Sequence, residues 1–172
     1  MIEIKSENEL KLISEAGKIV KLILEELKAA ARPGVTTADL EQKAVEIIKK
    51  FSARSAFQGY RGFPGVICTS LNEQVVHGIP GNTRLSSGDI LSIDVGVEKN
   101  GYYADSALTI PIGDKVSSSA LSLIDITEKA LYLGIEKAVE GNRLFDISNA
   151  IQKLTESHGY GVVREFVGHG IG

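Results

Sequence analysis

The sequence predicts an α+β fold made of two related halves, and three observations support this prediction. Two amphipathic helical segments open the chain, a stretch of short β-branched runs broken by Gly, Pro and Asn follows, and a second helical pair comes after that stretch. The chain has 172 residues, of which 43% are hydrophobic and 24% are charged. This length and composition suit one hydrophobic core, so we expect a single domain over residues 1–172.

The first two segments carry clear helix signals. Ser6 followed by Glu9 forms a capping box, and apolar residues then recur every three or four positions until the chain reaches Pro33. Residues 37–50 show the same periodicity, with Asp39 in the first turn, where an acidic side chain is favourable. We therefore predict one helix that ends before Pro33 and a second helix over residues 37–50.

The next part of the chain predicts a sheet and then helices again. Between residues 57 and 111 the apolar runs are short and rich in β-branched side chains, as in residues 90–95. Residues 119–139 and 146–157 are expected to form helices, and residues 162–167 a further strand. The predicted order is helix, helix, strands, helix, helix, strand.

This order indicates an internal repeat. Sliding the chain against itself by 107 residues (141 − 34) places Gly34 on Gly141 and Asp39 on Asp146. Both matched pairs fall at the start of the second helix of a predicted helix pair. The two halves are therefore expected to share the same order of elements.

The repeat places a boundary between the halves near residue 110. Residues 1–110 would form the first half, and residues 111–172 would begin the second half. If each half spans about the length of the repeat, the strands of the second half are mostly absent. We therefore expect the chain to be truncated in mid-fold.

Composition excludes several classes of function. The formal net charge is −3 and acidic and basic residues are interspersed, so we expect neither a nucleic-acid partner nor a membrane partner. The N-terminal residues are too acidic for a secretory signal, which favours a cytoplasmic location. Cys68 is the single cysteine and cannot form an internal disulfide, so we expect a buried thiol in a reducing compartment.

A predicted hairpin carries the most informative residues. The pair Asn100-Gly101 is a strong signal for a two-residue turn, and that turn places Gly96 opposite Asp105. Because side chains alternate along a strand, Asp94 shares a face with Gly96 and lies diagonal to Asp105. Two carboxylates at this spacing suit a pair of metal ions. The alternative is that both are ordinary solvent-facing strand residues.

Two of the three histidines are further candidates for chemistry. His169 lies between two glycines, which allow a ligand to approach closely, and His77 precedes Gly78 in a similar setting. The alternative for each is an ordinary histidine with a hydrogen-bond partner. His158 is better explained by the dipole at a helix C-terminus. A nucleophile elbow, a phosphate loop and a dinucleotide fingerprint are absent from the sequence, so metal chemistry is favoured.

Several segments together closely resemble type I methionine aminopeptidases, over essentially the whole chain. The matching residues are 59–64, 72–80 and 163–172, with Asp94 and Asp105 eleven positions apart (105 − 94). The resemblance implies the pita-bread fold of creatinases and aminopeptidases. In that fold, two pseudo-symmetric halves of helices and antiparallel strands enclose a central site.

The resemblance also implies roles for individual residues. Asp94 would bind one metal ion, Asp105 would bridge two, and His169 would bind the other. The complete site would hold two divalent ions, which the sequence does not identify among Co, Mn, Fe and Zn. His77 would hydrogen-bond near the scissile amide as the catalytic histidine on the substrate side. The residues expected to wall the methionine pocket are Phe57, Tyr60, Phe63 and Cys68.

The implied reaction is removal of the N-terminal methionine from peptides and nascent chains. A metal-bound hydroxide would attack the first peptide carbonyl, while the metal and nearby histidines stabilise the oxyanion. Contact with the ribosome and a monomeric full-length protein are further expectations. The two glutamate ligands of the family would lie after Gly172, so we expect the 172-residue chain alone to bind metal weakly and to turn over negligibly.

Two other readings remain open at this point. The first is an Xaa-Pro aminopeptidase or prolidase on the same fold, against which residues 72–80 argue. The second is a non-catalytic binding protein of the same fold, against which the retained Asp94, Asp105 and His169 argue. A truncated chain could also pair with another chain through its unpaired strand edges.

Overall fold

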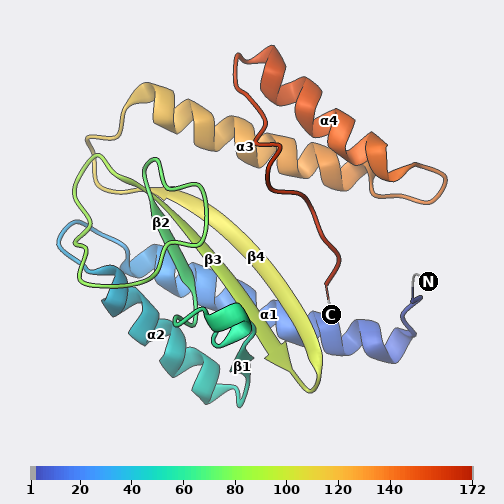
Figure 1. The fold of residues 1–172 in the computed structure, drawn as a ribbon, viewed down its shortest axis with the longest axis horizontal. Helices are drawn as coiled ribbons and strands as arrows, with labels where there is room; N and C mark the ends of the chain where they lie inside the picture. Colours follow the sequence, from blue (N-terminus) through green and yellow to red (C-terminus); the bar gives the residue numbers. More distant parts are fainter. Residues whose placement is uncertain (1–2, 172) are drawn as a thin grey trace. The chain divides into compact units, whose positions relative to one another are not determined.

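The computed structural model describes residues 3–171, which form two compact units (Figure 1). The first unit runs to Val116 and includes Gly170 and Ile171, and the second covers Ser117–His169. The helices and strands of the described residues are α1 (Glu7–Ala30), α2 (Thr37–Lys50), β1 (Arg54–Ser55), a 3₁₀ turn (Tyr60–Gly62), β2 (Cys68–Leu71), β3 (Ile90–Lys99), β4 (Tyr102–Pro111), α3 (Ser118–Lys137) and α4 (Leu144–Ser157).

Strand β3 is the centre of the antiparallel sheet in the first unit. It pairs with β4 along its whole length on one edge, and with β1 and β2 on the other edge. Asn100 and Gly101 have φ values of 54° and 84°, the left-handed conformation that a two-residue hairpin turn requires. Gly96 lies opposite Asp105, which confirms the predicted register. Residues 56–67 leave the sheet between β1 and β2.

Helices α1 and α2 cover one face of this sheet (Figure 1). The alternating residues of β3 that point to this face are fully buried, and α1 supplies aliphatic side chains against them. These buried residues are Leu91, Ile93, Val95 and Val97 of β3 with Ile23 and Leu27 of α1. Complete burial of each such side chain contributes about 1.5 to 3 kcal/mol. This layer is therefore the core that fixes β3 in place.

The opposite side of the sheet is named here the open face. Its members alternate with the core residues, so they point away from α1 and α2. They are Cys68 and Ser70 of β2, Ser92, Asp94 and Gly96 of β3, and Asp105, Ala107 and Thr109 of β4. The hydroxyls of Ser92 and Thr109 bond to each other at 2.8 Å across the β3–β4 pair.

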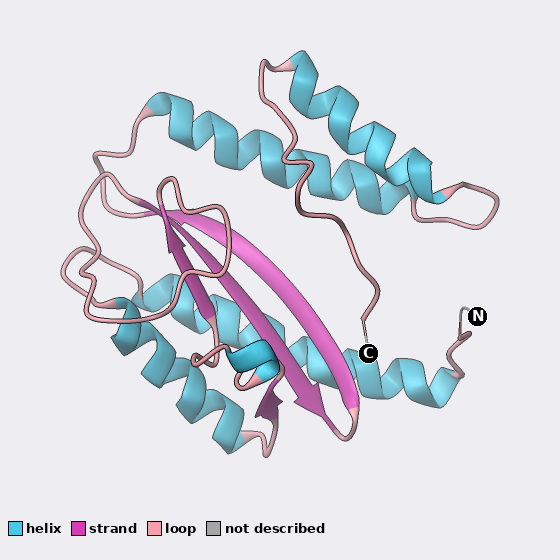
Figure 2. Ribbon diagram, viewed as in Figure 1, coloured by secondary structure: helices cyan, strands magenta, loops and turns pink. Residues whose placement is uncertain are grey.

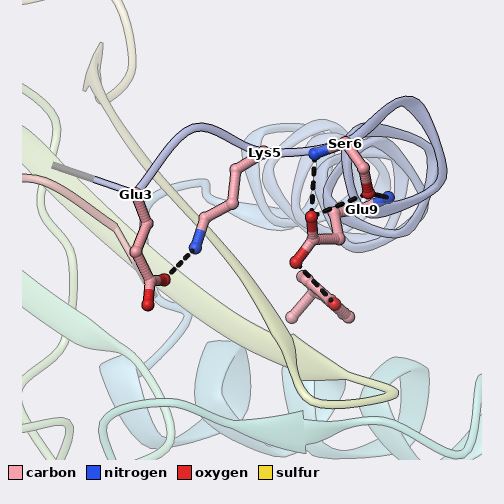
Figure 3. A network of polar contacts seen from close by, with 5 residues as sticks. Glu3, Lys5, Ser6 and Glu9 are labelled. Carbon is pink, nitrogen blue, oxygen red and sulfur yellow. Dashed lines mark hydrogen bonds and ion pairs between the residues drawn. The ribbon is translucent and has the colours of Figure 1, made fainter.

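The start of α1 has the predicted capping box (Figure 3). The Ser6 backbone N–H donates to Glu9 Oε2 at 2.8 Å, and the Glu9 N–H donates to Ser6 Oγ at 3.4 Å. The hydroxyl of Tyr102 also donates to Glu9 Oε1 at 3.2 Å. The first turn of α1 is thereby tied to the first residue of β4.

Within the second unit, α3 and α4 form a helical hairpin that reproduces features of the first. Helix α4 begins and ends 107 residues after α2 (144 − 37 and 157 − 50), which is the offset of the predicted repeat. Gly34 and Gly141 have φ values of 91° and 90°. Asp39 accepts from the Thr36 N–H at 2.8 Å, and Asp146 accepts from the Arg143 N–H at 2.7 Å. The repeat is therefore visible in the start of the second helix of each pair.

One predicted element is wrong. Residues 162–167 were expected to form a strand, but the segment after α4 is irregular in the described residues (Figure 2). A strand needs a hydrogen-bonding neighbour, and the ladders found within residues 3–171 do not include this segment.

Within residues 3–171, no helix combines the length and the hydropathy that a membrane span requires.

The β3–β4 hairpin offers a test through Glu98, whose side chain is 8% exposed. Its carboxylate accepts hydrogen bonds from the Gly101 backbone N–H and from Arg54 Nε at 2.6 Å, and these bonds, in that order, lower the pKa of Glu98. Glu98→Gln should reduce the free energy of unfolding at neutral pH by about 1 to 3 kcal/mol. Thermal unfolding of both proteins would measure this loss.

The loss should depend on pH in a defined direction. Because the folded-state pKa of Glu98 lies below its ordinary value of 4.5, its stabilisation is fully present above that value and disappears as the pH falls through the folded-state pKa. The difference between wild type and Glu98→Gln should therefore shrink on acidification. The exposed Glu15→Gln is the control. A pH-independent difference would contradict the role given to the Glu98 charge.

Candidate functional site

The open face holds the two carboxylates that the sequence singled out. Asp94 on β3 is half-buried and Asp105 on β4 is exposed. Because Gly96 pairs with Asp105, Asp94 and Asp105 are diagonal neighbours on the same face. Such neighbours have backbones about 7 to 8 Å apart, and their side chains reach closer. The structure therefore brings these two predicted site residues together.

Cys68 lies beside both carboxylates. It pairs with Asp94 in the β2–β3 ladder and is 4% exposed. Burial, and to a smaller extent the negative charges of Asp94 and Asp105, together raise the pKa of the Cys68 thiol to about 12. Both carboxylates thus act on one side chain, and the thiol stays protonated at neutral pH. Cys68 consequently stands beside the carboxylates as a neutral thiol and not as a thiolate nucleophile.

The Phe57 ring packs directly on Gly96. A Cβ placed on Gly96 would lie 2.5 Å from Cε1 of this ring. The chain before the ring is anchored, because the Ala56 N–H donates to the Gly96 carbonyl at 2.9 Å and the Phe57 N–H donates to Ser55 Oγ at 3.1 Å. The absence of a side chain at residue 96 thus allows an aromatic ring to sit beside the carboxylates.

Tyr60 and Phe63 lie in a tight turn that follows Phe57. The Gly59 N–H donates to the Phe63 carbonyl at 2.8 Å and closes the turn. Tyr60 is 64% exposed, Phe63 is half-buried, and the Arg61 guanidinium stands 5.4 Å from the centre of the Tyr60 ring. The two aromatic residues therefore belong to the same excursion of the chain as Phe57. Their contribution to a substrate pocket stays a prediction.

His77 is exposed in the segment that follows β2. Its φ of 59° is in the left-handed region, which is uncommon for a residue other than glycine. The next residue, Gly78, lies along the outer edge of β2, where its carbonyl accepts from the Thr69 N–H at 2.8 Å. His77 is therefore attached to the strand that carries Cys68.

His169 belongs to the second unit. It lies in the irregular segment after α4, within the second unit, and its side chain is exposed. The structure thus groups Asp94, Asp105, Cys68 and Phe57 in the first unit. The proposed partnership of His169 with the carboxylates stays a prediction.

The profile of metallopeptidase family M24 matches residues 11–172. The chain belongs to family M24.

Relatives of this M24 chain are similar along its whole length. It is 54% identical to the methionine aminopeptidase of Clostridium acetobutylicum, in a match that covers 100% of this chain and 69% of the relative. It is 49% identical to methionine aminopeptidase 1 of Bacillus subtilis, with the same coverage of both chains. The crystal structure of methionine aminopeptidase from Rickettsia prowazekii superimposes with a TM-score of 0.96 at 40% identity, over 99% of this chain and 68% of that one. The predicted pita-bread fold is confirmed.

The donors on the open face of this M24 metallopeptidase fit a divalent cation. Carboxylate oxygens are suitable ligands for such ions, and two like charges that act on one thiol repel each other unless a cation compensates them. Among residues 3–171, no group of three or more His, Cys, Asp or Glu side chains is arranged so that it could hold a metal ion. Asp94 and Asp105 are thus the pair of metal-binding candidates that the first unit supplies.

Sequence reasoning missed two features of the candidate site. Gly96 lies in the interior of a strand, which is a known signal of close approach, but its partner Phe57 could not be chosen from the sequence. Ser70, whose hydroxyl accepts from the Gly78 N–H at 3.0 Å, was also not singled out. A serine in a short strand gives no sequence signal that it bonds to a loop eight residues later.

The contact between Gly96 and Phe57 can be tested by a pair of substitutions. Gly96→Ala should lower the free energy of unfolding by about 1 to 3 kcal/mol, because the new methyl group overlaps the ring and forces it to move. In a Phe57→Ala background the same change should cost much less, since the ring is gone. Thermal or urea unfolding of the four proteins measures this coupling. Equal costs in both backgrounds would show that the ring does not rest on Gly96.

Proposed function

We propose that this M24 metallopeptidase removes the N-terminal methionine from peptides and nascent proteins by metal-dependent hydrolysis of the first peptide bond. The observation that carries the proposal is the convergence of Asp94 and Asp105 on the open face, next to the buried Cys68 and the Phe57 ring. The similarity to methionine aminopeptidases supports the substrate: an apolar wall beside two metal-binding carboxylates suits a methionine side chain placed next to the reacting bond.

The proposed metal site uses three residues of this chain. Asp94 would hold one divalent ion, Asp105 would bridge two, and His169 would hold the second. The ions would be drawn from Co, Mn, Fe and Zn. When bound, such ions activate water as a nucleophile near neutral pH and polarise the substrate carbonyl.

The chain's own side chains would then bind and orient the substrate. Phe57, Tyr60 and Phe63 would enclose the methionine side chain, since a thioether makes favourable contacts with aromatic rings. Cys68 would close the pocket with a protonated thiol, which adds no further negative charge beside the carboxylates. His77 would hydrogen-bond near the scissile amide and hold it in line for attack.

The proposal has consequences for organisation and surroundings. Residues 1–172 would belong to one catalytic domain, with residues 1–110 as the first half and 111–172 as the start of the second. Nascent chains as substrates imply work in the cytoplasm in contact with the ribosome, by a monomeric protein. These points rest on the resemblance to the family and stay predictions.

Methionine release from a Met-Ala-Ser peptide in the presence of Mn²⁺ or Co²⁺ tests this function. In the holoenzyme that contains this chain, Asp94→Asn or Asp105→Asn should lower kcat/KM by a factor of about 100 or more, because each removes a ligand charge. Calorimetric titration with Mn²⁺ should show weaker binding in both variants. Asp125→Asn is the matched control, since Asp125 is an exposed aspartate on α3 with a surface ion pair to Lys129.

Three results would overturn the proposal. Full activity in Asp105→Asn would remove the carboxylate pair from the mechanism. Faster cleavage of an Ala-Pro peptide than of Met-Ala-Ser would assign the protein to the Xaa-Pro peptidases. Failure of the wild-type holoenzyme to bind Mn²⁺ or Co²⁺ would indicate a binding protein without catalysis.

A further inference from the structure

The segment from Asn72 to Gly78, which carries His77, is fastened to the sheet at its beginning. The Asn72 N–H donates to the Ile90 carbonyl, and Asn72 Oδ1 accepts from the Ile90 N–H, both at 3.0 Å. The amide group of the same side chain donates to Asp89 Oδ1 at 3.0 Å. Asn72 is therefore locked to the first residue of β3.

The end of this segment is held by β2. The Gly78 carbonyl accepts from the Thr69 N–H at 2.8 Å, and the Gly78 N–H donates to Ser70 Oγ at 3.0 Å in a buried contact. A Cβ on Gly78 would overlap the Thr69 carbonyl oxygen, so the loop and the strand touch along their backbones. The loop is thus closed against β2 immediately after His77.

The backbone of His77, just before the second attachment, is strained. His77 has a φ of 59°, and a side chain in this region costs of order 1 kcal/mol, so the conformation persists only where the neighbouring structure holds it. The peptide that follows His77 is the one whose N–H is bound by Ser70. That hydrogen bond therefore acts directly on the torsion of the strained residue.

Ser70 also belongs to the open face. It pairs with Ser92 in the β2–β3 ladder, two positions from the pair of Cys68 with Asp94, and it is 3% exposed. Its hydroxyl therefore joins the surface that carries the carboxylates to the backbone of His77.

We propose that Ser70 is a positioning residue that acts through His77. By accepting the Gly78 N–H, its hydroxyl keeps His77 in the left-handed conformation and fixes the imidazole relative to Asp94 and Asp105. This inference rests on the proposed function, in which His77 orients the scissile amide. Ser70 itself contacts neither the substrate nor the metal ions.

A double-mutant cycle in the holoenzyme that contains this chain tests the proposal. Ser70→Ala should lower kcat for Met-Ala-Ser about 10-fold and leave the Kd for Mn²⁺ unchanged. In a His77→Ala background, Ser70→Ala should have little further effect on kcat, because its target is gone. Ser92→Ala is the matched control: it removes the directly opposed hydroxyl, which bonds to Thr109 and not to the loop.

A measurement independent of turnover accompanies the kinetics. Amide hydrogen exchange at Gly78 should become at least about 10-fold faster in Ser70→Ala and remain unchanged in Ser92→Ala. If Ser70→Ala fails to fold, Ser70→Cys keeps the volume with a weaker acceptor and should show a smaller change in the same direction.

The outcomes separate the two proposals. Equal losses of kcat from Ser70→Ala with and without His77, weaker Mn²⁺ binding, or unchanged exchange at Gly78 would each overturn the positioning role. A wild-type holoenzyme that releases no methionine, together with the expected faster exchange at Gly78 in Ser70→Ala, would overturn the proposed function. The hydrogen bond from the Gly78 N–H to Ser70 would still hold the loop on β2.

Discussion

The pairing of β3 with β4 is the constraint on which the rest of the first unit depends. Side chains alternate along both strands, so a slip of one residue would turn the charged face of β4 into the core. The turn at Asn100 and Gly101 prevents this slip, because both residues adopt positive φ and allow only one alignment. Glu98 adds a second restraint, because its carboxylate accepts a hydrogen bond from the Gly101 backbone N–H in the turn.

Strand β3 therefore contributes to the hydrophobic core on one side and carries a proposed metal ligand, Asp94, on the other. Val95 and Val97 are completely buried against the helices, while Asp94 and Gly96 between and beside them face outward. A charged group in the middle of a sheet reduces the stability of the fold unless other groups compensate its charge. Asp94 and Asp105 lie on the same face of the sheet, opposite the aliphatic core. The aliphatic layer beneath would give the proposed pair of metal-binding carboxylates a rigid support.

Local sequence signals predicted the parts of the fold that depend on neighbouring residues. The capping box of Ser6, the hairpin turn and the repeat between Asp39 and Asp146 are all of this kind. The strand expected at residues 162–167 does not form, because β-branched residues adopt a strand only where another strand pairs with them. Leu10 fits the helical periodicity of α1 but is 54% exposed, since periodicity does not say how far a helix extends over its sheet.

The candidate site also combines features that local sequence signals predict with features that depend on distant contacts. The diagonal placement of Asp94 and Asp105 follows from the turn and from strand alternation, so it could be derived from the sequence. The packing of Phe57 on Gly96 joins residues 39 positions apart (96 − 57), and no periodic pattern reports such a contact. The roles of His77 and His169 came from the family resemblance, because a lone histidine carries no geometric information.

The excursion of residues 56–67 between β1 and β2 carries the aromatic residues proposed to bind the substrate, whereas the proposed metal-binding carboxylates lie on strands. Both flanking strands remain paired to β3, while the aromatic residues sit on the loop that leaves the edge between them. Such a loop can change length and sequence without altering the ladder that aligns the carboxylates. Substitutions in this loop could therefore change the proposed pocket wall while Asp94 and Asp105 keep their places on the sheet.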